Sequence, residues 1–170
     1  MNIIDRFVEY VKIPTMSDPN SDTYPSSSKQ LVLAKLLKEQ LANLVDKVEL
    51  TDTGIVYAFL KANYECNETI GLIAHMDTSP DMSDENVNPR VINNYDGTVI
   101  KLNENIIMNP KDFPCLLNDI GADIMVTDGT TLLGGDDKAG VAIIMDVLER
   151  LKENPKIKHK NLAIAFTPDE

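Results

Sequence analysis

The chain has 170 residues, of which 43% are hydrophobic and 25% are charged, as in a folded globular domain and unlike a disordered or fibrous chain. Its 27 acidic residues outnumber its 16 basic residues, and the formal net charge is −11. Such a surface repels nucleic acid phosphates and anionic lipid headgroups, so we expect neither nucleic acid nor a membrane as a partner. The two cysteines, Cys66 and Cys115, are too few for a disulfide framework, and the first residues lack the unbroken apolar stretch of a signal peptide. These features predict a cytoplasmic protein.

Two amphipathic helices are predicted near the N-terminus. Apolar residues recur at helical spacing from Ile4 to Val11, behind Asn2, a residue type that caps helices. A polar, turn-rich loop over residues 15–28 follows. A second apolar stripe then predicts a long helix from about residue 28 to residue 45.

The pattern next changes from helical to strand-like. Residues 47–51 and 55–62 flank a short turn and predict a hairpin. The apolar run over residues 69–75 predicts a strand that is buried on both faces, and residues 161–167 predict a final strand.

Between these strands lies a segment of mixed character. Residues 79–128 contain four prolines and only short apolar runs, which indicates an irregular excursion, and residues 124–127 and 131–133 are expected to pair as a hairpin. A helix is predicted to begin at the glycine-rich stretch 134–140 and to end at Pro155. The whole pattern predicts an α/β fold in which a layered mixed sheet carries helices on its faces.

Polar residues follow three of the predicted strands. His75 and Asp77 end one strand, Asp136 and Asp137 lie at a strand-to-helix turn, and Glu170 follows the last strand. The Asp pair fits either a helix cap or a carboxylate that bridges two divalent cations, whereas its spacing does not match a phosphate-binding loop. One histidine with several carboxylates and no nearby cysteine is ligand chemistry for zinc, manganese or cobalt.

Four sequence strings resemble the dinuclear-zinc metallopeptidase family, which contains aminopeptidases, carboxypeptidases and deacylases. They are Ala-His-Met-Asp-Thr-Ser-Pro-Asp (74–81), Asn-Val-Asn-Pro (86–89), Thr-Leu-Leu-Gly-Gly-Asp-Asp-Lys-Ala-Gly (131–140) and Ala-Phe-Thr-Pro-Asp-Glu (165–170). The resemblance runs along the whole chain in the family's order. The narrower of these strings favour the tripeptide aminopeptidases of the family, which implies small peptides as substrates and two zinc ions as cofactors.

The resemblance also implies a role for each candidate residue. His75 would be a ligand of one zinc, and Asp136 would bridge both zincs, which leaves Asp137 as a helix cap. Asp77 would orient the imidazole of His75. Glu170 would be the general base that accepts a proton from the attacking water and passes it to the leaving amine.

The chain departs from the family pattern in what it lacks. The family places a second Glu directly after the base, and an Asp and a His further along; these would lie beyond residue 170, as would a smaller inserted domain. His159 lies in a basic surface loop and is not expected to replace the missing ligand. We therefore expect residues 1–170 to be the N-terminal part of a catalytic domain, inactive alone and prone to associate through an open sheet edge.

Two alternatives remain on sequence alone. The complete protein could instead be a dipeptidase, a carboxypeptidase or an N-acyl-amino-acid deacylase, since the same motifs serve all of these. The chain could also be a truncated α/β fragment that binds or assembles without catalysing a reaction.

Overall fold

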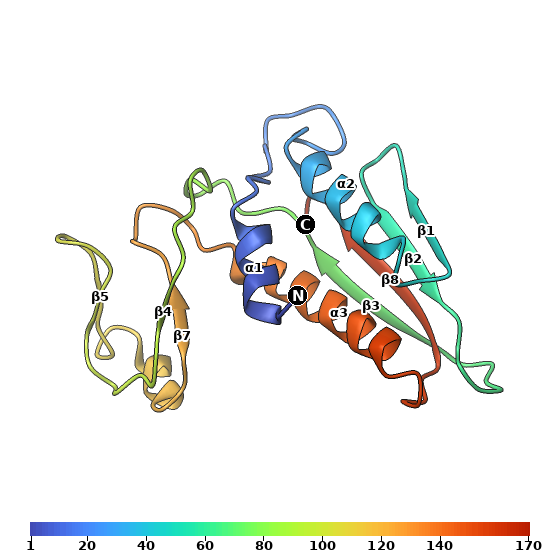
Figure 1. The fold of residues 1–170 in the computed structure, drawn as a ribbon. Coiled ribbons are helices and arrows are strands. Elements are labelled where there is room, and N and C mark those ends of the chain that lie inside the picture. Colours follow the sequence, from blue (N-terminus) through green and yellow to red (C-terminus); the bar gives the residue numbers. More distant parts are fainter.

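The structure is a computed structural model that describes residues 1–170 (Figure 1). Its main sheet has four strands in the order β1-β2-β8-β3. The helices are α1 (Ile3–Val11), α2 (Gln30–Leu41) and α3 (Gly135–Glu153), and the strands of the main sheet are β1 (Lys47–Leu50), β2 (Val56–Leu60), β3 (Thr69–His75) and β8 (Asn161–Thr167).

The main sheet is mixed, as the sequence predicts. The hairpin of β1 and β2 is antiparallel, β2 pairs antiparallel with β8, and β8 pairs parallel with β3. In this register His75 lies opposite Thr167, so β3 and β8 end at the same edge of the sheet. That edge is where an open α/β sheet places its ligands.

The three helices all lie on one face of the main sheet (Figure 1). Helix α3 packs on β3, α2 packs on β1 and β2, and α1 packs on α3. Between the helices and the sheet lies a core of 17 buried residues, to which β8 contributes Leu162, Ile164 and Phe166. The predicted layered α/β architecture is confirmed, with one helical layer.

The opposite face of the main sheet has no helical cover, which corrects one expectation. The sequence predicts that β3 is buried on both faces, but Ile73 is 71% exposed and Tyr57 is 48% exposed. Ile73, Ala165 and Tyr57 are register partners across β3, β8 and β2. The prediction fails because β3 is an edge strand with only one of its faces packed against helices.

Smaller differences concern the ends of elements. Helix α2 is shorter than predicted and covers Gln30–Leu41. Asn2 caps α1 by accepting the backbone N–H of Asp5, as expected.

None of the helices combines the length and the apolar composition that a bilayer span requires.

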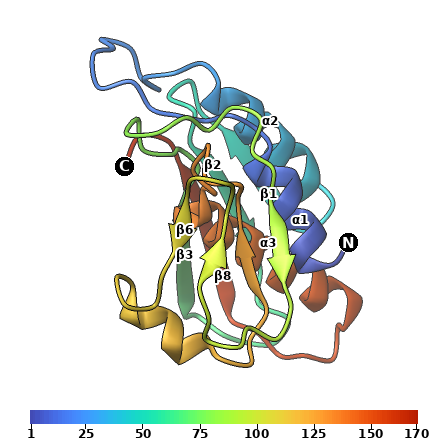
Figure 2. The ribbon, with the colours of Figure 1, turned by 90° about the vertical axis from the view of Figure 1, so that its left-hand side faces the viewer.

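A side lobe, which we define as residues 90–126, projects from this body (Figures 1 and 2). Its small core consists of Tyr95, Ile100 and Leu116. Its elements are β4 (Arg90–Ile92), β5 (Ile100–Lys101), β6 (Ile107–Met108), a 3₁₀ helix η1 (Pro114–Asp119) and β7 (Ile124–Val126).

The pairing within the side lobe differs from the predicted hairpin. Strand β7 pairs antiparallel with β4 and not with residues 131–133. The turn after β7 is closed instead by a side chain, because the Thr127 hydroxyl donates to the carbonyl of Thr131 at 3.1 Å. The predicted turn at residues 128–129 is present, but β7 pairs with β4 and not with residues 131–133.

Candidate active site

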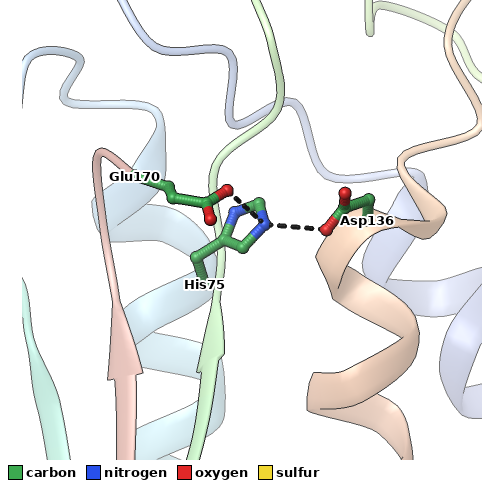
Figure 3. Close-up of side chains that lie close together, drawn as sticks. All are labelled: His75, Asp136 and Glu170. Atoms are coloured by element: carbon green, nitrogen blue, oxygen red, sulfur yellow. Dashed lines mark hydrogen bonds and ion pairs between the residues drawn. The ribbon is translucent and has the colours of Figure 1, made fainter.

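Three segments far apart in the sequence meet at the carboxyl edge of the main sheet (Figure 3). His75 is the last residue of β3, Asp136 lies at the start of α3, and Glu170 lies just past β8. Pro168 ends β8 after Thr167, as the sequence predicts. The structure thus brings together the residues that the sequence singles out.

The side chains of these residues converge on one point. His75 Nε2 lies 3.1 Å from Asp136 Oδ1 and 3.1 Å from Glu170 Oε2. One potential ligand atom from each of the three residues lies within 4.8 Å of the other two. The imidazole side chain is 14% exposed, whereas the Asp136 and Glu170 carboxylates are 94% and 73% exposed, so the cluster opens to solvent on its carboxylate side.

Asp77 lies behind the imidazole. Its Oδ1 atom is 3.3 Å from His75 Nδ1 and accepts the backbone N–H of Glu170 at 3.2 Å. This contact favours a proton on Nδ1. Nε2 then faces Asp136 and Glu170, to which it donates when the imidazole is protonated, and its lone pair can bind a cation when the imidazole is neutral. The carboxylate of Asp77 is therefore placed to hold both the imidazole and the backbone of Glu170.

The two adjacent aspartates at the start of α3 have different structural roles. Asp136 and Asp137 both have non-helical backbone angles, and the helix proper follows them. Asp137 Oδ1 accepts the backbone N–H of Gly140 at 3.0 Å, so Asp137 caps the helix, as expected, while Asp136 remains free to project. A Cβ at Gly140 would lie 2.4 Å from Asp137 Oδ1, so this cap requires a glycine at position 140.

The charges around His75 set its protonation. Burial alone would lower its pKa, but Asp136, Asp77 and Glu170 together outweigh burial, and the pKa of His75 is raised above its ordinary value. A cluster of carboxylates that stabilises a positive charge on the imidazole also offers a favourable position for a bound cation.

Two buried charged residues beneath the site were not predicted. Lys138 is fully buried and donates from Nζ to the carbonyl of Ile13 at 2.8 Å; burial lowers its pKa to about 8, against the opposing influence of Asp84 and Asp77. Asp84 Oδ2 accepts the backbone N–H groups of Thr15 and Met16 and the Thr78 hydroxyl.

The sequence contains a signal for the buried lysine. Position 138 lies three, seven and ten residues before Val141, Met145 and Leu148, which is the spacing of one helix face, so it falls on the buried stripe of α3.

A cavity of about 490 Å³ opens beside the cluster. It is lined by the four site residues and by mostly small or polar neighbours that include Ser17, Ser79, Gly134 and Gly135, with Leu132 and Leu133 as apolar walls. A volume of this size suits a small ligand.

The donor set fits zinc. An imidazole nitrogen whose second nitrogen is held by a carboxylate, together with the Asp136 carboxylate, is part of a ligand combination that zinc accepts, and the Glu170 carboxylate lies beside both. His159 takes no part, because its backbone bonds to Asn63 near the start of β8, at the opposite end of the sheet from His75.

Comparison with known proteins shows sequence similarity to peptidases over nearly the full chain. Residues of this chain are 51% identical over 99% of its length to peptidase T of Clostridium acetobutylicum, and 49% identical over 99% to peptidase T of Lysinibacillus sphaericus. The chain is similar to peptidase T along its whole length. It spans 42% of the length of both of these relatives. No protein-family model matches the chain.

Solved structures confirm the fold. An aminopeptidase from Bacillus cereus superposes with a TM-score of 0.66 at 22% identity, covering 98% of this chain and 35% of that one. A tripeptidase from Staphylococcus aureus superposes with a TM-score of 0.64, also at 22% identity, with the same coverage of both chains. The resemblance predicted from the sequence strings is therefore confirmed for peptidase T.

Proposed function

We propose that the complete protein is a metal-dependent aminopeptidase that releases the N-terminal residue from tripeptides. The observation that carries the proposal is the convergence of His75, Asp136 and Glu170 within 4.8 Å, in a chain that is 51% identical to a peptidase T. The chain itself supplies part of the site, since the relatives are more than twice as long. We expect residues 1–170 alone to bind zinc weakly, because catalytic zinc sites commonly use three protein ligands and His75 and Asp136 provide two.

In this proposal His75 and Asp136 would hold zinc, and the family resemblance implies that Asp136 would serve both ions. Bound zinc supplies a Lewis acid that polarises the scissile carbonyl and lowers the pKa of the attacking water. Asp77 fixes the imidazole through Nδ1. Glu170 accepts the proton of the water and delivers it to the leaving amine, a role for which its carboxylate is accessible from solvent.

The substrate class is tested on the complete protein. A panel of tripeptides, dipeptides, N-acyl amino acids and C-terminally extended peptides separates the tripeptidase from the other activities that the same motifs serve. We expect cleavage of tripeptides, loss of activity with a chelator and recovery with zinc. Preferential cleavage of another class would reassign the substrate, and no cleavage of any class would reject the enzyme.

The roles of the two exposed carboxylates are separated by substitution. Glu170→Gln should lower kcat by about 10²–10⁴-fold with zinc content unchanged, because it removes the proton acceptor and not a ligand. Asp136→Asn should lower the zinc stoichiometry. Asp137→Asn is the matched control, since it removes the same charge one residue away and keeps an oxygen for the cap on Gly140. Full zinc content and normal turnover in either test variant would reject its assigned role.

We also expect the enzyme in the cytoplasm and as a homo-oligomer. Cys66 and Cys115 are both free thiols, which suits a reducing compartment. The open edge of β3 and the uncovered face of the main sheet are surfaces on which the rest of the complete chain or a second copy can pack. Cell fractionation and light scattering on the complete protein test these two expectations.

A further inference from the structure

Glu170 is presented by a turn with an unusual backbone. Asp169 has a φ of 52°, in the left-handed region that side-chain-bearing residues seldom adopt. The Glu170 side chain that follows is 73% exposed and has few contacts of its own. Its position therefore depends on whatever holds the turn at residues 168–170.

Asp77 accepts the backbone N–H of Glu170, and the rest of the turn is held by a short segment at the start of α2. The carboxylate of Asp169 accepts the backbone N–H of Ser26 at 2.6 Å and the Ser26 hydroxyl at 2.5 Å. Gln30 binds the same residue at two points. Its Nε2 donates to Asp169 Oδ1 at 2.6 Å, and its Oε1 accepts the backbone N–H of Asp169 at 3.2 Å.

Gln30 is placed where packing alone would favour an apolar residue. It is fully buried and occupies the first position of the stripe that continues with Leu33, Leu37 and Leu41. A buried amide is costly unless both its donor and its acceptor are satisfied. Asp169 satisfies both ends of this amide, and Ser26 Oγ is a weaker additional partner at 3.3 Å.

We propose that Gln30 is a positioning residue for the catalytic carboxylate: it clamps Asp169 at two points and so fixes the turn that places Glu170 beside His75. This inference rests on the proposed role of Glu170 as general base. A base must lie within hydrogen-bond reach of the proton it accepts, and a displacement of about 1 Å is enough to cost about 100-fold in rate. Removal of the clamp therefore affects the chemical step and not the binding of peptide or metal.

The first test is Gln30→Ala in the complete protein. We expect kcat to fall by about 10–100-fold. KM should change by less than about twofold, and zinc content should be unchanged, because no ligand is touched. An unchanged kcat, or a loss that appears only in KM or in zinc content, would overturn the proposal.

Gln40→Ala is the matched control. Gln40 lies on the same helix and is also hydrogen-bonded through its amide, since its Oε1 accepts the Tyr10 hydroxyl at 2.5 Å and its Nε2 donates to Glu9. It has no contact with the turn that carries Glu170. We expect near-normal kcat in this variant; a loss equal to that of Gln30→Ala would mean that general loosening of α2 explains both.

Two milder variants keep the test decisive if Gln30→Ala does not fold. Gln30→Met preserves the volume of the buried side chain and removes both hydrogen bonds, so it should give the same loss of kcat. Ser26→Ala removes one hydroxyl donor and keeps the backbone N–H, so it should give a smaller loss with the same selectivity for kcat. Normal kcat in folded Gln30→Met would reject the proposal.

A double-mutant cycle identifies the residue through which Gln30 acts. In a Glu170→Gln background, Gln30→Ala should cause little further loss, because the group it positions is already inactive. An equally large further loss would show that Gln30 acts elsewhere and would overturn the proposal.

A crystal structure of the Gln30→Ala protein gives a readout that is independent of activity. We expect the Glu170 carboxylate to be displaced from His75, and an unmoved turn would contradict the proposal. If Glu170→Gln alone retained normal kcat, the proposed base would be wrong, whereas the structure of the variant would still decide whether Gln30 holds the turn.

Discussion

The body of the molecule and the side lobe are stabilised very differently. The body encloses 17 buried apolar residues between three helices and a four-stranded sheet. The side lobe has only three such residues, and its strands form a pair of small sheets with two strands each. Strands β3 and β8 have seven residues each, while β5 and β6 have two. All four candidate site residues belong to the body. Groups that must be held in fixed geometry are thus carried by the region with the larger core.

The largest expected effect comes from the core of the body. Phe166 is fully buried in β8, which lies between β2 and β3. Phe166→Ala should lower the free energy of unfolding by about 3–5 kcal/mol, because it removes buried contacts and leaves a cavity. Urea unfolding of the complete protein measures the change. Phe113→Ala in the side lobe, where the side chain is 48% exposed, is the control and should change stability by less than about 0.5 kcal/mol.

A smaller and local effect is expected in the side lobe. Ile100 is 4% exposed and belongs to the three-residue cluster. Ile100→Ala should cost about 2 kcal/mol. Because the cluster is separate from the main core, amide hydrogen exchange should accelerate in β4–β7 and stay unchanged in β3 and β8. Faster exchange in β8 would show that the two regions unfold as one unit.

The smallest effect concerns two turns of similar chemistry. In the side lobe, Asp96 accepts the hydroxyl and the backbone N–H of Thr98, and these bonds hold the pKa of Asp96 below its ordinary value. Asp128, just past the lobe, has the same arrangement with Thr130, and its pKa is also lowered. A carboxyl group whose pKa is lowered on folding adds stability above its unfolded pKa, and this contribution is lost as the pH falls through the folded value.

Thr98→Val separates the two turns. It removes the hydroxyl donor and keeps the backbone N–H, so the pKa of Asp96 should rise toward its ordinary value while that of Asp128 stays lowered. A pH titration followed by carboxyl carbon NMR measures both groups in one experiment. No rise for Asp96 would assign its lowered pKa to the backbone alone.

The same contrast between body and lobe decides what could be predicted from the sequence. The helices and long strands of the body have clear sequence patterns, and the bounds that these patterns predict for α1, β1, β2, β3 and β8 lie close to those in the structure. The strands of the lobe are too short to show a period, and the predicted partner of β7, residues 131–133, differs from its actual partner β4. A two- or three-residue strand is defined by its pairing, which sequence pattern alone does not contain.

The candidate site was predictable for a related reason. Each of its four residues ends a long strand, lies within three residues of a strand end or begins a long helix, so the topology brings them together once the fold is correct. Periodicity does not single out Gln30 and Lys138, because each is polar at a buried helix position that usually holds an apolar residue, and Asp84 lies in a loop that has no periodic pattern. The exposed face of β3 was missed because an apolar strand does not reveal how many of its faces are packed.

The position of β8 in the main sheet has a consequence for the order of folding. Strand β8 lies between β2 and β3 in the sheet, although it is synthesised long after both of them. The β1–β2 hairpin can form from local contacts, but β3 has no partner in the sheet until residues 161–167 have been synthesised. During translation both edges of β3 therefore stay unpaired until the whole side lobe and α3 have emerged from the ribosome. We expect the sheet to be completed in one late, non-local step, with a high contact order and a correspondingly slow rate.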